Sequence, residues 1–389
     1  MATDANAPGT PAVDFHQMWR AVRAQGPVVP GPPSDYYPGP TALVVGFEEA
    51  SQVLRDGQTY SSSIHTRQDD FRGVTIRQMD GPEHRRHRAL LAHAFRPSAV
   101  ERWEREVVRP VIDALLDAVA PHGRAELVSE VTSAFPIQVI CTVLGIPPAE
   151  HARFLAWSEQ IVRGAMDPQA GLAAKDDLGE FLAPHVEARR ADPRDDLLSD
   201  LVGAEVDGER LDDDHLYGFL RLLIPAGAET TYRALGTVLL ALLTHPEALA
   251  SARVRPETIP MIVEETLRWD TSIPMTVRTA AEDTVLAGCP VAAGTTVQVI
   301  VAAADRDGTR WDEPDRWDPD RAPQPSLAFG LGPHQCLGIH LARTELHVGV
   351  RAVLERLPNL RLDPAEPVPT VEGMAFRGPT RLPVLFDPV

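Results

Sequence analysis

The chain has 389 residues, of which 44% are hydrophobic and 24% are charged, as in an ordinary globular protein with ample core. Its formal net charge of −18 argues against general binding to nucleic acids or anionic membranes. The three cysteines are too few for a disulfide framework in so long a chain, which favours a reducing compartment.

The N-terminus lacks the basic stretch and the apolar stretch of a signal peptide. The longest apolar runs, such as residues 238–243 and 299–304, are far too short to cross a membrane. We therefore expect a cytoplasmic protein without a membrane anchor.

Residues 1–40 are rich in proline and glycine apart from a helical pattern at residues 15–24, which predicts an extended lead-in with one helix. Residues 41–45 predict a strand and residues 47–55 a helix. Residues 58–79 lack periodicity and predict a long loop. We expect one domain from residue 41 to residue 389.

Residues 82–95 begin with a proline and continue with helix formers, so they predict a helix. His84 and Arg88 lie four residues apart, on one face of this helix, where both could donate to the same anion. Spacing alone favours a solvated basic face, and an anion site is the alternative.

Residues 98–191 predict several successive amphipathic helices and carry no catalytic spacing. An acidic start at residues 212–214 then opens a long, mostly apolar run to about residue 244, which predicts a buried central helix.

The middle of this run, Pro225-Ala-Gly-Ala-Glu-Thr-Thr231, is an unusual helix interior, because proline removes a hydrogen bond and glycine lowers stability. Ala226 and Gly227 leave room for a flat cofactor. The Thr230 hydroxyl could bond to the carbonyl of Ala226, four residues earlier. A packing kink is the alternative.

Glu265 and Arg268 lie three residues apart on a further predicted helix and can pair on one face. Such pairs contribute little at a surface. Residues 273–278 then lead into a β-like region that includes residues 295–301.

The most informative stretch is Phe329-Gly-Leu-Gly-Pro-His-Gln-Cys-Leu-Gly338, followed by a helix-like run at residues 339–357. A helix that begins just after Cys336 turns its free N–H groups and its positive dipole end toward a thiolate, the form of cysteine that binds soft metals. Gly330, Gly332 and Gly338 would let the loop lie against a planar cofactor. An ordinary glycine-rich turn is the alternative. We expect Cys141 and Cys289 to be small buried hydrophobes.

These motifs, in this order, resemble those of the cytochrome P450 superfamily, soluble bacterial type. The cysteine loop matches the family form Phe-x-x-Gly-x-His-x-Cys-x-Gly at each fixed position. The resemblance implies a mainly α fold with small β-sheets, in the triangular, α-rich single-domain architecture. It also implies haem b, iron protoporphyrin IX, held by an axial thiolate from Cys336.

The resemblance assigns roles residue by residue. His84 and Arg88 would hold one haem propionate and Arg278 the other. Glu229 and Thr230 would deliver protons through water as oxygen is activated, although Pro225 departs from the commonest pattern. The remaining haem contacts would be Ala226, Gly227, Phe329, Gly330, His334, Cys336 and Gly338.

The same resemblance predicts a buried network of Glu265, Arg268 and Arg321 that serves folding and haem retention rather than chemistry. Substrate contacts are predicted at Ile273, Pro274, Met275, Thr276, Met374, Ala375 and Phe376, all of which are equally plausible as core residues. The segment from Ala304 to Asp307 matches a family segment that carries asparagine at the position of Asp305, and we infer no function from that difference.

The implied function is a monooxygenase that inserts one oxygen atom of O2 into an apolar small molecule, by hydroxylation or epoxidation. The composition favours the tailoring of natural products. No flavin-binding region is recognisable, so a ferredoxin and its reductase would supply electrons, and a monomer is expected. The alternatives are a peroxide-dependent or rearranging haem-thiolate enzyme and a haem-free docking module.

Overall fold

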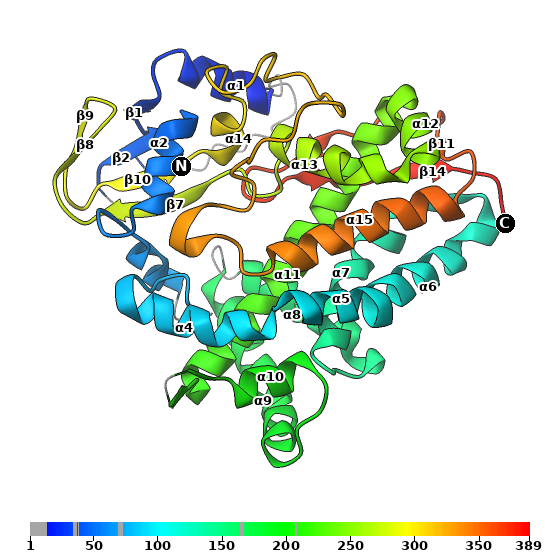
Figure 1. Ribbon diagram of the computed structural model, residues 1–389, viewed down its shortest axis with the longest axis horizontal. Helices are drawn as coiled ribbons and strands as arrows, with labels where there is room; N and C mark the ends of the chain where they lie inside the picture. Colours follow the sequence, from blue (N-terminus) through cyan, green and yellow to red (C-terminus); the bar gives the residue numbers. More distant parts are fainter. Residues whose placement is uncertain (1–13, 34–36, 38, 69–72, 164–166, 207) are drawn as a thin grey trace.

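The computed structural model describes residues 14–33, 37, 39–68, 73–163, 167–206 and 208–389. Helices dominate this part of the chain, and the largest sheet lies toward one side of the molecule (Figure 1). The α-helices are α1 (Phe15–Arg23), α2 (Phe47–Arg55), α4 (Gly81–Ala94), α5 (Pro97–Trp103), α6 (Arg109–Val119), α7 (Ala134–Val143), α8 (His151–Arg163), α9 (Pro168–Ala191), α10 (Leu197–Gly203), α11 (Asp213–Thr244), α12 (Pro246–Val254), α13 (Ile259–Trp269), α14 (Val301–Ala304) and α15 (Ile339–Arg356).

Short 3-10 or π-helical turns join several of these helices. They are η1 (Ser63–Gln68), η2 (Glu104–Val108), η3 (Ala120–His122), η4 (Val128–Thr132), η5 (Pro148–Glu150), η6 (Pro256–Thr258) and η7 (Gly332–His334). The strands are β1 (Val28–Pro30), β2 (Thr41–Val44), β3 (Tyr60–Ser61), β4 (Arg124–Glu126), β5 (Glu205–Val206), β6 (Glu209–Arg210), β7 (Thr276–Ala280), β8 (Thr284–Leu286), β9 (Cys289–Val291), β10 (Thr296–Val299), β11 (Arg361–Leu362), β12 (Val371–Glu372), β13 (Gly378–Pro379) and β14 (Pro383–Leu385).

The largest sheet has the strand order β1-β2-β10-β7-β3. Strand β10 pairs parallel with β2 and antiparallel with β7, which places Val297 opposite Arg278. A second sheet, in the order β11-β14-β4, joins the end of the chain to its first third. Because β1 pairs with β2 and α1 packs beside this sheet, the predicted lead-in contributes a helix and a strand to the fold.

Helix α11 is the central element, and Figure 1 shows it passing behind α15. Its first turn is capped by Asp212, whose carboxylate accepts the His215 N–H at 2.9 Å, and Asp213 and Asp214 complement the helix dipole there. The helix continues without a break through Pro225. The lost N–H of that proline leaves one carbonyl of the preceding turn without its helical donor.

The main hydrophobic core forms where α11 packs between α7 and α15. Leu235 and Val238 of α11, Phe135 of α7 and Val350 of α15 are fully buried there. Burying each such side chain stabilises the fold by about 1.5–3 kcal/mol. This packing fixes the position of α11 relative to the loop that precedes α15.

The predicted elements are found close to their expected bounds. The helices expected at residues 47–55, 82–95 and 339–357 are α2, α4 and α15. The β-like region expected at residues 295–301 ends earlier than predicted, because the chain turns into the short helix α14 at Val301.

Within the described ranges, no single helix is long and apolar enough to cross a membrane. Helices α11 and α12 reach that length and composition only when taken together, and the chain bends by 107° between them.

Candidate functional site

Cys336 lies in the tight loop between η7 and α15. Its backbone N–H donates to the Phe329 carbonyl at 2.8 Å and closes the loop. Gly332 has a φ of +73° and lies against α2, where a Cβ atom would be 2.4 Å from the Leu54 carbonyl oxygen. This position therefore requires glycine. The loop is thereby held against α2, which fixes the place of Cys336.

The Cys336 side chain is exposed, yet protein surrounds it closely enough to change its acidity. Burial raises the pKa of the Cys336 thiol, while the Gly338 N–H and the guanidinium groups of Arg88 and Arg343 oppose that rise. Arg343 is itself held by Glu264 through contacts of 2.6 and 2.8 Å. The thiol thus faces groups that stabilise its anionic form.

The residues predicted to bind the haem propionates lie together beside this loop. The rings of His84 and His334 are 4.1 Å apart, and His334 Nε2 lies 3.5 Å from Asp80 Oδ1. Burial and the neighbouring cations lower the pKa of His84 to about 4. Burial also lowers the pKa of Arg278 to about 10. Within the described residues, the hydrogen bonds of its guanidinium go to uncharged oxygens of its own strand, at 2.7 and 3.4 Å.

The two arginines of this group have too little negative charge around them. Among the described residues, no carboxylate forms an ion pair with Arg88 or Arg278, and His84 Nε2 is buried without a hydrogen-bond partner. Asp80 is the carboxylate that faces the group. Buried donors without partners are costly, so an anionic ligand is expected here. The residues present therefore fit haem, whose two propionates would satisfy them.

On α11, Ala226 is exposed in the middle of the helix. The Thr230 hydroxyl donates to the Ala226 carbonyl at 2.9 Å, as the sequence predicts. Glu229 is paired with Arg233 at 2.7 Å and accepts the Tyr232 hydroxyl at 3.2 Å. Arg233 was not predicted from the sequence, although glutamate and arginine four residues apart on a helix are a recognisable pairing signal.

The predicted network of Glu265, Arg268 and Arg321 forms. Arg268 Nε lies 2.7 Å from Glu265 Oε2, and both side chains are buried. Arg321 Nε lies 3.2 Å from Glu265 Oε1. Both arginines also donate to backbone carbonyls between Asp305 and Arg316. The network therefore fastens α13 to the segment that leads into the cysteine loop.

The predicted substrate residues lie on two short segments. Ile273, Pro274, Met275 and Thr276 follow α13, and Met374, Ala375 and Phe376 form the turn between β12 and β13. Met275 packs against the cluster that contains Trp19, which agrees with the core alternative for that residue. Met374 is 54% exposed, so it is free to contact a ligand.

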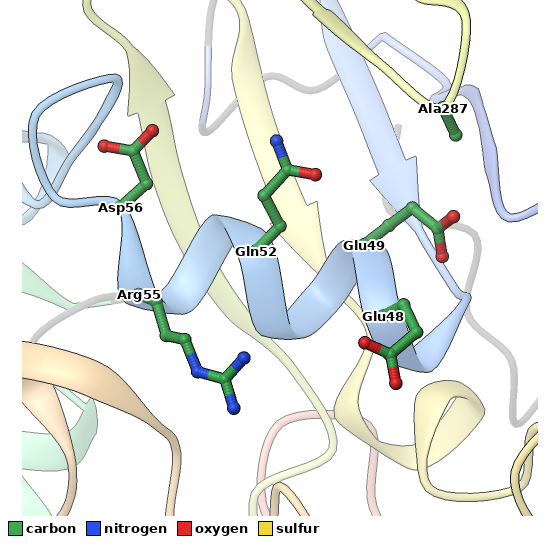
Figure 2. Close-up of a pocket in the computed structure, with 6 residues that line it drawn as sticks. All are labelled: Glu48, Glu49, Gln52, Arg55, Asp56 and Ala287. Atoms are coloured by element: carbon green, nitrogen blue, oxygen red, sulfur yellow. The ribbon is translucent and has the colours of Figure 1, made fainter.

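A separate hollow lies on the outer side of α2. Figure 2 shows Glu48, Glu49, Gln52, Arg55 and Asp56 along that helix, with Ala287 from the β8–β9 turn opposite them. None of the residues that line this hollow belongs to the cysteine loop or to α11. It is therefore distinct from the site described above.

Comparison with known proteins gives consistent similarities. Residues 257–382 match the family model described as Cytochrome P450. The chain is 36% identical to Mycinamicin IV hydroxylase/epoxidase of Micromonospora griseorubida, over 88% of this chain and 89% of that protein. It is 34% identical to Pentalenic acid synthase of Streptomyces avermitilis, over 90% of each chain. The solved structure of Cytochrome P450 CYP109Q5 from Chondromyces apiculatus superposes with a TM-score of 0.88 at 30% identity, covering 96% of this chain and 95% of that one.

Proposed function

The chain belongs to the cytochrome P450 family, and from this premise we propose which of its residues carry out the family's chemistry. It is a haem-thiolate monooxygenase that takes electrons from a redox partner and acts on a small molecule. When bound, the haem supplies the oxidant that inserts one oxygen atom of O2 into the substrate. The observation that carries the proposal is the convergence of Cys336 with His84, Arg88, Arg278 and His334 beside one loop.

We propose that Cys336 would bind the haem iron through its thiolate. The Gly338 N–H donates to its sulfur and tempers the negative charge of the thiolate. His84 and Arg88 would bind one propionate, and Arg278 and His334 would bind the other. The buried, unpartnered Nε2 of His84 and the desolvated guanidinium of Arg278 support this assignment, since both gain a partner when a carboxylate binds. Phe329, Gly330, Ala226 and Gly227 complete the proposed haem contacts.

Thr230 and Glu229 are the proposed proton carriers. Because the Thr230 hydroxyl donates its hydrogen to the Ala226 carbonyl, its oxygen remains able to accept a hydrogen bond from water. Glu229 is held by Arg233 at 2.7 Å, so it must first separate from that guanidinium to take up and release a proton. The Arg233 pair therefore sets the resting position of the carrier.

The proposed substrate is an apolar natural product that the two segments at 273–276 and 374–376 orient. The similarity to a mycinamicin IV hydroxylase/epoxidase and to a pentalenic acid synthase supports a tailoring reaction, either hydroxylation or epoxidation. A ferredoxin and its reductase are the proposed electron source. The chain is strongly acidic, with a net charge of −18, but Arg85 and Arg86 form a local basic cluster that would bind an acidic ferredoxin.

The test uses the purified, haem-loaded protein with a bacterial ferredoxin, its reductase and NADPH under carbon monoxide. Reduction should produce the absorption band of a carbon monoxide complex with a thiolate ligand, and Cys336→Ala should lack this band even when haem is supplied. An unaltered band in Cys336→Ala would make the ligand assignment wrong. Reduction by dithionite but not by the ferredoxin system would reject the electron source alone.

A further inference from the structure

Asp270 and Arg377 form a buried ion pair outside the haem site. Arg377 Nε lies 2.8 Å from Asp270 Oδ1 and its second nitrogen 3.1 Å from Oδ2, and each side chain is 4% exposed. Asp270 ends α13 three residues before Ile273, and Arg377 directly follows Phe376. The pair therefore joins the two segments that carry the proposed substrate contacts.

Arg377 also makes hydrogen bonds that shape both segments. Its backbone N–H donates to the Ser272 carbonyl at 2.9 Å, and its guanidinium donates to the Gly373 carbonyl at 3.0 Å. Gly373 has a φ of +99°, and a Cβ atom there would be 2.0 Å from the Phe376 carbonyl oxygen. The turn over residues 373–376 is thus tightly folded around this one guanidinium.

The outer side of the ion pair is covered by α1. His16 Nε2 lies 3.1 Å from Asp270 Oδ2, and the Phe15 ring lies 3.7 Å from Arg377 Cζ. Burial lowers the pKa of His16, although Asp270 opposes that change, so the imidazole is neutral near pH 7 and its Nε2–H donates to the carboxylate. The Asp14 carboxylate fixes the start of the helix by accepting two backbone N–H groups.

The Asp270–Arg377 ion pair is also connected to α11, through the β12–β13 hairpin. Gly378 of β13 packs against Arg233, where a Cβ atom would be 2.6 Å from the Arg233 Cβ. Arg233 is the partner of Glu229. On its other side α1 packs against Met275, in the cluster that contains Trp19. Helix α1 thus contacts one substrate segment directly and the other through Arg377.

We propose that α1 is a positioning element of the substrate site, in which Phe15 and His16 hold the Asp270–Arg377 pair so that the segments 273–276 and 374–376 keep one relative position. This inference rests on the proposed placement of those two segments at the substrate. Phe15 and His16 lie outside the segments 273–276 and 374–376 and outside the cysteine loop, and they act through the ion pair. Their effect is on the shape of the pocket rather than on the haem itself.

The experiment measures the binding of two nitrogen ligands to the haem-loaded protein by spectral titration. Imidazole needs only the haem, whereas phenylimidazole must also fit between the pocket walls. His16→Gln keeps an N–H at the reach of Nε2, while the shorter side chain in His16→Asn loses contact with Asp270. We expect His16→Asn and Phe15→Leu to weaken phenylimidazole binding about three- to tenfold, as for couplings transmitted through neighbours, with imidazole binding unchanged.

His16→Gln should bind both ligands as the unaltered protein does, and so should Gln17→Ala, a matched change at an exposed position of the same helix. Equal affinity ratios in all variants, or a parallel loss for both ligands, would overturn the proposal. Failure of His16→Asn to load haem while His16→Gln loads it would make α1 a structural clamp, which also overturns it. If neither ligand shifts the spectrum of the unaltered protein, the proposed function fails instead.

Discussion

Asp305 is an ionisable side chain placed where a charge is poorly tolerated. It is fully buried, its Oδ1 accepts the Leu327 N–H at 2.8 Å, and its Oδ2 has no hydrogen-bond partner within the described residues. Burial raises the pKa of this carboxyl to about 8, although the Leu327 N–H and two arginines oppose the rise. The resembled family carries asparagine here, which would fill the space without titrating.

We predict that Asp305→Asn stabilises the protein increasingly as pH rises from 5 to 8. The unfolded chain ionises above a pKa of about 3.9, while the folded chain keeps Asp305 protonated up to about pH 8, so the unaltered fold loses stability across that window. The gain should grow by up to about 1.4 kcal/mol per pH unit, the linkage value for one proton, and so amount to at most about 4 kcal/mol between pH 5 and pH 8. Thermal melting at several pH values measures it. Asp320→Asn, at an exposed position, should show no such trend, and a pH-independent gain at Asp305 would contradict the prediction.

Local contacts could be predicted from the sequence at this scale, and distant ones could not. Helical spacing predicts that Thr230 can bond to Ala226 and that Glu265 can pair with Arg268. The burial of the second pair was expected only from the family resemblance. Asp270 and Arg377 are 107 residues apart, and no periodicity relates two such positions. They are in contact because the end of α13 and the turn between β12 and β13 lie next to each other in the fold.

At the scale of elements, the helices were the most predictable feature, because acidic first turns mark α2 and α11. A long run of helix-forming residues after the cysteine loop marks α15. The contact between the cysteine loop and α2 was not predicted. A glycine-rich sequence indicates that a loop can approach something closely, but the identity of the neighbour depends on the tertiary fold. Here that neighbour is the carbonyl of Leu54.

We predict that Gly332→Ala displaces the cysteine loop from α2 and weakens haem retention. A Cβ atom at this position would clash with backbone atoms 2.4 and 2.8 Å away, and the φ of +73° is itself strained for alanine, at about 1–3 kcal/mol. Haem loss to an excess of apomyoglobin should be several times faster than in the unaltered protein. Gly203→Ala, with no atom within 4 Å of the added Cβ, is the matched control. Equal rates for the two variants would show that the loop yields without consequence.

At the scale of the whole molecule, long-range ion pairs connect helices to loops. The Glu265 network reaches from α13 to Arg321 through Glu265 Oε1, which accepts bonds from Arg321 and from the Asp318 N–H. Because these groups are buried, they differ from the many exposed pairs on the surface. Removing one partner leaves the others without compensation.

We predict that Glu265→Gln destabilises the fold by about 3–5 kcal/mol, because two guanidinium groups lose their counter-charge. The melting temperature and the haem content should fall together. Glu205→Gln removes the partner of Arg210 in an exposed pair of 2.8 Å and should change stability by about 0–1 kcal/mol. A loss at Glu265 no larger than at Glu205 would mean that the network contributes nothing to the fold.

The ion pair of Asp270 and Arg377 beneath α1 has a consequence for protein engineering. Chimeras of related chains are usually assembled by exchanging contiguous blocks of sequence. In this protein Phe15, His16, Asp270 and Arg377 belong to three blocks that are remote in the gene but adjacent in space. A library that draws these blocks from different parents would mix incompatible partners, so the three should be inherited as one unit.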